Sequence, residues 1–304
     1  MPLTFRNIKK WWKMIRHKSI LHVNQGLGKC CSFERVEGYY NDLTEKVTKD
    51  TKTYNSVFPM TTVDDNGREL CYPVVVFQYG LGAYDLFLLK VDEDLMKEKF
   101  LCQLDWAFAN QNSDGSWNNF GPLLPNAPFS SMAQGEGASL LIRGYKMTGK
   151  KEYLDAAKRA LEFMTIDLKH GGTASYVGED VYFYEFTCYP CVFNGWIFSI
   201  FGLMDYYIET KDEKYKILLD KTISTLKNNL QKMDNGYWSM YRDDKTIASP
   251  FYHDLHIAQL KALYLFTKDS VFENYYLKFE TYRSKKWNRT KAFWVKAFQK
   301  VFRK

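Results

Sequence analysis

The sequence has no apolar run long enough to cross a bilayer. The longest such run covers residues 191–204 and is interrupted by Asn194 and Gly195, whereas a membrane-spanning helix needs about 20 apolar residues. The first residues are basic, but they lack the continuous apolar segment and small-residue cleavage site of a secretory leader. We therefore expect a cytoplasmic protein whose six cysteines are reduced thiols.

Acidic residues are missing from both ends of the chain. Residues 1–22 carry six basic residues and residues 284–304 carry eight, and neither segment contains Asp or Glu. Because the net charge of the whole chain is +7, the body between these two tails has a net charge of −7. An acidic body argues against a broad nucleic-acid-binding face.

The tails are rich in aromatic as well as basic residues. Residues 287–304 predict an amphipathic helix with Trp294, Val295, Phe298, Val301 and Phe302 on one face and Lys291, Lys296, Lys300 and Arg303 beside them. This pattern is typical of helices that lie on an anionic membrane surface. The basic segment around Trp11 and Trp12 has a similar character. The alternative is that both tails simply pack on the fold.

Metal-binding motifs are incomplete. Cys188 and Cys191 have the spacing of a zinc or redox site, but no second pair is present to complete four ligands. We predict no metal and no other cofactor.

An internal repeat indicates the fold class. Thr148, Thr210 and Thr267 are each followed five residues later by an aromatic residue. Each Thr follows an apolar helical segment and precedes an amphipathic one, and the spacings are 62 and 57 residues. Repeated helix pairs predict a mainly α protein, an incomplete α/α toroid of the (α/α)6 type. Short β-hairpins and a small irregular or β N-terminal segment complete the prediction, with one helix following another from Gln78 onward.

The repeat also predicts where a site lies. Counted back from the Thr of their own repeats, Gln134, Asn194, His253 and His256 all fall near the starts of inner helices. Long connections precede these starts, and loops gathered on one rim of a toroid form a ligand-binding funnel.

Residues 249–264 (SPFYHDLHIAQLKALY) form the strongest candidate segment. Ser249 suits an N-cap and Pro250 the first helical position, so Tyr252 and His253 lie at a helix start, which favours anions. The alternative is a buried helix start whose histidines bond the backbone.

Two further segments feed the same rim. Tyr184 and Glu185 place a phenol beside a carboxylate in a long loop, which suits acid/base chemistry. The turn at 234–236 predicts a hairpin that projects Tyr241 or Arg242 towards Tyr252 and His253. By contrast, we interpret QNSDGSW (111–117) as a structural link between helices.

Several motifs together resemble the C-terminal domain of D-glucuronyl C5-epimerases, which convert glucuronate to iduronate within heparan-type chains. They occur in matching order over residues 37–283: VVFQYGLGAYDL (75–86), QNSDGSW (111–117), SSMAQGEGASLLIRGYKMTG (130–149), NGWIFSIFGLMDYY (194–207), YWSMY (237–241) and SPFYHDLHIAQLKALY (249–264). The resemblance implies an α/α toroid that acts on an acidic, uronate-containing polysaccharide such as heparosan.

The resemblance and the rim geometry define the candidate residues. The candidate catalytic residues are Tyr184, Glu185, Tyr241, Tyr252 and His253. The candidate substrate-binding residues are Gln78, Tyr79, Gln134, Glu136, Asn194, Arg242 and His256. We expect Glu185 or Tyr184 to act on one face of the sugar and Tyr252 on the other, while Tyr241, His253 and Arg242 polarise its carboxylate.

The predicted organisation has three parts: a basic segment (1–36), a catalytic toroid (37–283) and a basic C-terminal helix (284–304). A peripheral position on the inner face of the cell membrane and a homodimer are compatible with it. A polysaccharide lyase, a glycoside hydrolase and a non-catalytic glycan-binding module remain open alternatives to the epimerase.

Overall fold

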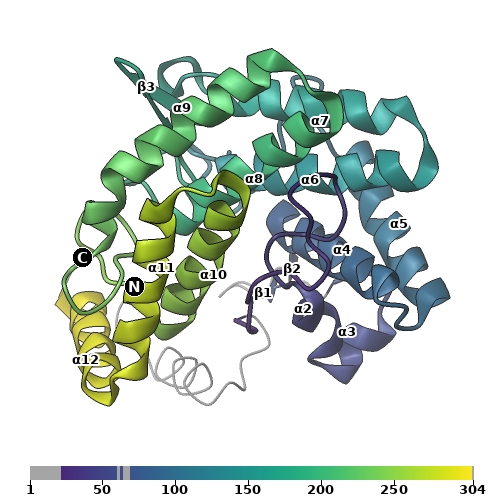
Figure 1. Cartoon of the computed structure of the whole chain (residues 1–304). Helices are drawn as coiled ribbons and strands as arrows, with labels where there is room; N and C mark the ends of the chain where they lie inside the picture. The colour runs from purple at the N-terminus through teal and green to yellow at the C-terminus, as the bar shows by residue number, and fades with distance from the viewer. Residues whose placement is uncertain (1–21, 60–61, 64–68, 303–304) are drawn as a thin grey trace.

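The structure is a computed structural model that describes residues 22–59, 62–63 and 69–302 (Figure 1). Its main elements are four consecutive helical hairpins: α4 (Pro73–Leu88) with α5 (Glu93–Ala109), α6 (Ser131–Thr148) with α7 (Lys151–Met164), α8 (Phe193–Thr210) with α9 (Glu213–Asn229), and α10 (Pro250–Thr267) with α11 (Ser270–Ser284). The shorter elements are α2 (Thr44–Thr48), α3 (Thr51–Asn55), β1 (Thr62–Val63), β2 (Glu69–Leu70), η1 (Leu168–His170), β3 (Ala174–Val177), β4 (Asp180–Phe183) and η2 (Leu230–Met233). A last helix, α12, covers Lys286–Phe302.

The hairpins form an arc with an inner and an outer layer. The first helices of the hairpins (α4, α6, α8 and α10) contact one another in sequence, and each packs against its own outer partner. The inner helices are buried on nearly all sides, whereas the outer helices bury one face. Figure 1 shows the arc from α4 and α5 round to α10 and α11. The predicted incomplete α/α toroid is confirmed, with antiparallel β1–β2 and β3–β4 pairs as its short hairpins.

The repeated threonine ends three inner helices in the same way. Thr148, Thr210 and Thr267 are the last residues of α6, α8 and α10, and the next residue of each adopts positive φ. Each hydroxyl donates to the carbonyl four residues earlier and accepts the N–H two residues later. The repeat therefore encodes the connection from inner to outer helix, as an αL cap with a threonine side chain across it.

The first inner helix begins earlier than predicted. The β-branched run before Gln78 is helical, because α4 begins at Pro73, which needs no N–H hydrogen bond at the first helical position. Short helices α2 and α3 also precede it where we expected irregular or β structure. Burial of Val76 and Phe77 against the core outweighs the local strand preference of this segment.

Two glycines allow α6 and α8 to approach each other closely. A Cβ atom built on Gly202 would lie 2.6 Å from the Cα atom of Gly135, and one built on Gly135 would lie 2.7 Å from the carbonyl oxygen of Phe198. Larger residues at either position would push the helices apart. The glycines therefore set the spacing of the central inner pair.

A buried ion pair fixes the base of the arc. The Nη1 atom of Arg143 in α6 lies 2.6 Å from Oδ2 of Asp205 in α8, and both side chains are fully buried. Arg143 also donates to the carbonyl oxygens of Glu37 and Gly38, while the Tyr40 hydroxyl donates to Asp205. The N-terminal segment is thereby attached to both helices.

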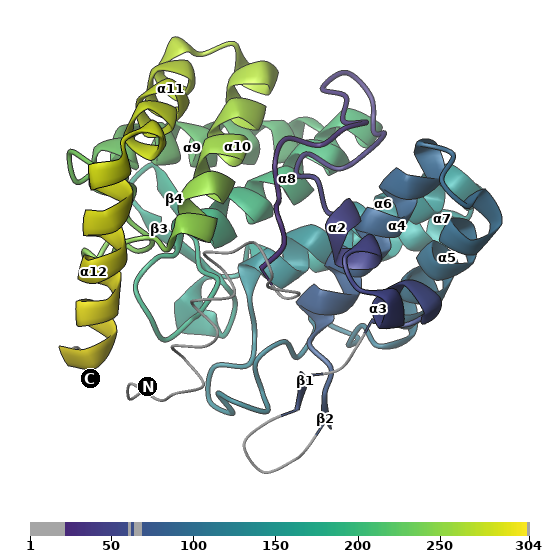
Figure 2. The same cartoon turned by 90° about the horizontal axis from the view of Figure 1, so that it is seen from below.

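The last helix packs on the hairpin that follows η2. Ala292 is fully buried and Val295 packs against the core. Lys296 donates to the carbonyl oxygen of Ile247, and the side chain of Gln299 accepts a hydrogen bond from the Ile247 N–H. The prediction that Val295 and Lys296 belong to a free amphipathic surface is therefore wrong. Figure 2 shows α12 at one margin of the arc.

Parts of both predicted tails cannot be compared with the structure. Residues 1–21, with Trp11 and Trp12, and residues 303–304 lie outside the described residues. The same holds for the side chains of residues 300–302, which include Val301 and Phe302.

Breaking the buried pair is expected to destabilise the whole fold. The Asp205→Ala variant leaves the Arg143 guanidinium charged and buried without its partner, so unfolding free energy should fall by about 3–5 kcal/mol. The matched control is Asp220→Ala, which removes an exposed ion pair with Lys216 on α9 and should cost about 0.5 kcal/mol or less. Urea unfolding followed by circular dichroism measures both, and equal losses would contradict the central role of Arg143–Asp205.

Candidate active site

Two tyrosines and a glutamate from three separate segments come together at the rim. The rings of Tyr241 and Tyr252 pack against each other with their centroids 4.6 Å apart. Burial is the main cause that raises both phenol pKa values, and the charge of Glu185 raises them further. Glu185, from the loop after β4, is therefore within electrostatic range of both phenols.

The hairpin that carries Tyr241 has the predicted turn at its start. Gly236 has φ +87°, a bridge pairs Asp234 with Ser239, and a second bridge pairs Met240 with Ile247. Its far side is attached to the start of α8, because the Phe193 N–H donates to the Tyr241 carbonyl at 3.2 Å. The backbone of Tyr241 is thus held from two sides.

Glu185 occupies space that a glycine leaves open. A Cβ atom built on Gly195, at the start of α8, would lie 2.5 Å from Oε2 of Glu185. This oxygen has no hydrogen-bond partner among the described residues, and the side chain is 8% exposed. Burial accordingly raises the pKa of Glu185 to about 8, which makes its carboxylate a stronger base than that of an ordinary glutamate.

A second carboxyl lies further along the inner helices. Glu136 of α6 is fully buried, and its Oε1 accepts a hydrogen bond from Nε2 of Gln78 in α4 at 2.9 Å. Burial raises the pKa of Glu136 to about 8, the amide of Gln78 and the charge of Lys46 oppose this rise, and Glu185 adds to it. Glu136 and Gln78 therefore adjoin the Glu185 cluster.

Lys46 is a member of the site that sequence reasoning missed. It is a half-buried lysine on the short helix α2, and burial lowers its pKa to about 8 against the favourable charge of Glu136. A five-residue helix carries no periodic signal, and only the packing of α2 on α4 brings this ammonium group to the rim.

The neighbouring residues Tyr184 and Glu185 lie on different sides of their loop. Burial raises the pKa of Tyr184 to about 12, and the charged or polar groups that add to this rise are Cys191, Asp243 and Tyr182 rather than the two rim tyrosines. The Tyr184 backbone pairs with Thr173 and Ser131. Of the two alternatives predicted from the sequence, the structure places Glu185, and not Tyr184, beside Tyr252.

Two further candidates lie at the edge of the cluster. Asn194 is buried at the start of α8, and its Oδ1 has no hydrogen-bond partner among the described residues. The guanidinium of Arg242 is 2.8 Å from Asp244 and donates to the Thr246 hydroxyl, and its charge still lowers the pKa of Tyr241 against the larger effect of burial. Both remain candidates for contact with a ligand.

The predicted catalytic role of His253 is wrong, because neighbouring groups occupy both ring nitrogens. Nε2 lies 3.0 Å from the Phe279 carbonyl oxygen and must donate to it, so Nδ1 is the acceptor of the Ser239 N–H. The ring stacks on Trp238 with centroids 3.7 Å apart, and burial lowers its pKa to about 3. His253 anchors the Tyr241 hairpin to α10 as a neutral side chain.

His256 continues the same network. Its Nδ1 lies 2.9 Å from the Ser239 hydroxyl, whereas Nε2 has no hydrogen-bond partner among the described residues. Burial lowers the pKa of His256 to about 3. This imidazole is therefore neutral, and its Nε2 is buried.

Two predicted substrate-binding residues are structural instead. All hydrogen-bonding atoms of the Gln134 amide are engaged: Nε2 donates to the carbonyls of Gly115 and Ala160, and Oε1 accepts from the Trp117 N–H. This confirms that the QNSDGSW segment links helices. The Tyr79 hydroxyl is within hydrogen-bonding distance of the Ser56 carbonyl oxygen and accepts from Lys99, which attaches α4 to the loop after α3.

A cavity of about 660 Å³ opens beside the cluster. It lies between the N-terminal segment, α2, α10 and α12, and aromatic, basic and acidic side chains line it, among them Phe251, Phe293, Arg289, Lys49 and Glu45. Glu185, Tyr241 and Tyr252 do not line this cavity themselves. His22 and Phe251, which line the cavity, both contact the ring of Tyr252, so the cavity borders the cluster.

Phenols and carboxyls, the titratable groups of the cluster, suit acid/base chemistry. Within the described ranges, no group of three or more His, Cys, Asp or Glu side chains is placed to hold a metal ion. All six cysteines are free, and Cys191 is buried with Sγ 3.7 Å from the Phe183 carbonyl oxygen. The fold and the cluster define an α/α-toroid protein with paired phenols and a buried carboxyl at the N-terminal ends of its inner helices.

Comparison with known proteins identifies the family. A family model described as D-glucuronyl C5-epimerase C-terminus matches residues 109–281, more than half of the chain. The chain therefore belongs to the D-glucuronyl C5-epimerase family.

Two curated relatives are similar to parts of the chain. A D-glucuronyl C5-epimerase of Caenorhabditis elegans is 27% identical over 201 residues, which cover 57% of this chain and 33% of the relative. An uncharacterized protein of Methanocaldococcus jannaschii is 27% identical over 144 residues, which cover 45% of this chain and 47% of the relative. The matches thus span a third to a half of the relatives' lengths.

A solved structure was also found by comparison. The crystal structure of an unsaturated glucuronyl hydrolase specific for heparin matches with 15% identity and a TM-score of 0.46, over 80% of this chain and 81% of that one.

The raised pKa of Glu185 predicts how stability depends on pH. Its pKa is about 8 in the fold against an ordinary value of 4.5, so the folded state holds an extra proton between these pH values. Stability from this group is fully present below the lower value and is lost as the pH rises through the higher one. The Glu185→Gln variant should therefore lose less unfolding free energy than the wild type between pH about 5 and about 9.

Urea unfolding across this pH range measures the difference. The control is Glu280→Gln, which alters an exposed glutamate on α11 and should keep the pH dependence of the wild type. An unchanged pH dependence in Glu185→Gln would show that this carboxyl is not buried as described.

Proposed function

We propose that the protein is a uronate C5-epimerase that acts on a glucuronate-containing polysaccharide of the heparosan type and converts glucuronate to iduronate. The observation that supports this proposal best is the meeting of Glu185 with the packed rings of Tyr241 and Tyr252 at the inner-helix rim. Membership of the D-glucuronyl C5-epimerase family agrees with it.

The reaction needs a base and an acid on opposite faces of one sugar. The base removes the proton at C5, which is alpha to the carboxylate, and the acid returns a proton from the other face. In our proposal the ionised Glu185 is the base. Its raised pKa suits proton abstraction, and the raised phenol pKa values keep Tyr241 and Tyr252 protonated as donors.

The developing negative charge also needs stabilisation. Loss of the C5 proton makes the uronate an enediolate-like dianion, so donors or cations must face its carboxylate. We infer that Lys46 supplies this charge and that the Gln78 amide assists it, because Glu136 interacts with both. Arg242, beside Tyr241, and Lys296, whose Nζ lies 5.2 Å from the centroid of the Tyr241 ring, are the cations near the phenols.

Tyr252 is expected to be essential for hydrogen exchange at C5. Incubation of heparosan-type polymers in deuterated water, followed by NMR, measures deuterium incorporation at this carbon. Tyr252→Phe removes the proton donor but keeps the ring, and the rate should fall about 100-fold or more. The matched control is Tyr184→Phe, because this phenol faces Asp243 and Cys191 instead, and it should keep the rate.

Other outcomes of this experiment would select other functions. An unsaturated uronate product would indicate a lyase, and new reducing ends without unsaturation would indicate a hydrolase. Binding without turnover would indicate a glycan-binding module. Loss of exchange in Tyr184→Phe together with normal exchange in Tyr252→Phe would reverse the assignment of the two phenols.

Lys46 is expected to act on the reaction rather than on the fold. Lys46→Met keeps the length of the side chain but removes its charge, so kcat/KM should fall about 100-fold, as for other groups that stabilise a developing anion. Lys52→Met removes an exposed lysine from α3 and serves as the control. A wild-type kcat/KM in Lys46→Met, with both variants folded by circular dichroism, would assign the cationic role to another residue.

A further inference from the structure

Helix α12 has one face that packs on the fold and another face whose large side chains are exposed. Ala292 and Val295 pack inward, and Gln299 is bonded to the hairpin through Ile247 and Lys245. On the opposite side, Trp287 is 76% exposed, Trp294 66% and Phe298 63%. These are the three most exposed large hydrophobic side chains among the described residues.

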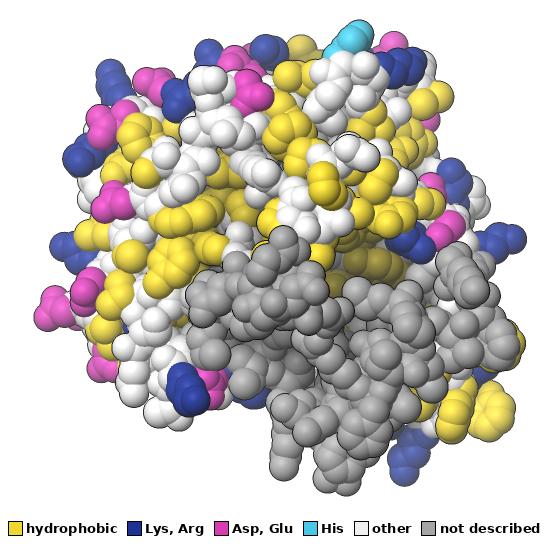
Figure 3. All heavy atoms as spheres, turned by 180° about the vertical axis from the view of Figure 1, so that it is seen from behind, with side chains coloured by type: hydrophobic (Ala, Val, Ile, Leu, Met, Phe, Trp, Pro, Cys, Tyr) yellow, Lys and Arg dark blue, Asp and Glu magenta, His cyan; other side chains and the backbone are white. Residues whose placement is uncertain are grey.

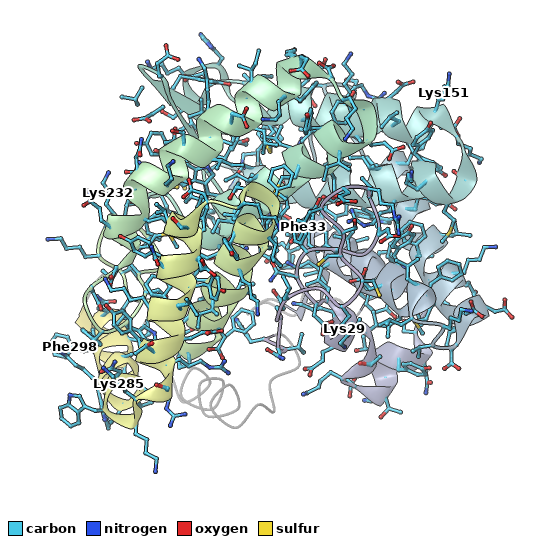
Figure 4. The ribbon with its side chains drawn as sticks, viewed as in Figure 1. Lys29, Phe33, Lys151, Lys232, Lys285 and Phe298 are labelled. Atoms are coloured by element: carbon cyan, nitrogen blue, oxygen red, sulfur yellow. The ribbon has the colours of Figure 1, made fainter. Side chains whose placement is uncertain are left out.

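The three aromatic residues form a single stripe. Spacings of seven and four residues place side chains above one another on a helix. Figure 4 shows Phe298 at the outer edge of the molecule, away from the inner helices. In Figure 3, the corner that holds α12, at the lower right, displays hydrophobic and basic side chains next to each other.

The charges around the stripe have one sign. Lys285, Lys286 and Arg289 are exposed at the start of the helix, and the sequence from 284 to 304 contains no acidic residue. Tryptophan and phenylalanine beside lysine and arginine form the composition that enters the headgroup region of a bilayer.

The depth of contact is set by the length and polarity of the helix. Among the described residues, no helix combines the length and apolar character that crossing a bilayer requires. A 17-residue helix with a polar packed side can bury only its outer stripe. Surface contact is therefore the form of membrane binding that α12 can make.

We propose that the outer stripe of α12 docks the protein on an anionic lipid surface. The inner side of this helix holds the Tyr241 hairpin: Lys296 donates to Ile247 and lies 5.2 Å from the centroid of the Tyr241 ring. Docking therefore orients the rim cluster relative to the membrane. Because the stripe is argued from exposure and charge, this proposal stands independently of the proposed epimerase activity.

Vesicle sedimentation with the full chain tests the docking. The protein should bind vesicles of phosphatidylcholine mixed with phosphatidylglycerol, bind vesicles of phosphatidylcholine alone much less, and lose binding as salt is raised. Replacing Trp287, Trp294 and Phe298 together by Ser should weaken binding about tenfold or more. The matched control is Ile217→Ser on α9, which removes a side chain that is 58% exposed outside the stripe and should leave binding unchanged.

A second measurement locates the contact on α12. Brominated lipids in the anionic vesicles should quench tryptophan fluorescence, and the Trp287→Phe/Trp294→Phe variant should lose most of this quenching. Wild-type binding in the triple variant, or undiminished quenching in the double variant, would overturn the proposal. So would a change from dimer to monomer in the triple variant by analytical ultracentrifugation, because the stripe would then be covered by a second copy.

Discussion

The buried ion pair between Arg143 and Asp205 is the constraint on which the rest of the arrangement depends. Two charges without exposed surface are stable there only because each neutralises the other and backbone carbonyls accept the remaining guanidinium protons. The pair joins α6 to α8, and through Tyr40 it joins both to the N-terminal segment. The N–H of Tyr39 bonds Asp85 of α4 in the same region. The ends of three inner helices are thus fixed together, and their opposite ends are left to carry the site.

The toroid combines a repeated frame with a site that is not repeated. The same threonine cap ends α6, α8 and α10, so three hairpins share one form of connection from inner to outer helix. At the other ends of these helices the side chains differ: Glu136, Asn194 and Tyr252 lie within the first two turns of α6, α8 and α10. Regular packing at one end therefore tolerates specialised chemistry at the other, where loops and the hairpin supply Glu185 and Tyr241.

Local patterns in the sequence predicted the frame well and the free side chains less well. The threonine spacing predicts the alternation of inner and outer helices, and the N-cap residue Ser249 predicts the start of α10. Whether a polar side chain at the rim is available depends on distant partners. Gln134 is occupied by Gly115 and Ala160, and His253 by Ser239 and Phe279. Lys46 shows the converse, since tertiary packing alone brings a lysine of an irregular region to Glu136.

Gly195 suggests a different way to think about altering this protein. Because Gly195 has no side chain, Glu185 packs directly against its backbone. A Cβ atom added at position 195 would collide with the Oε2 and Cβ atoms of Glu185. The size of the side chain at position 195 therefore controls where the Glu185 carboxyl lies, without changing the carboxyl itself. A substitution at Gly195, which has no reactive group of its own, would shift this carboxyl relative to the phenols without deleting it.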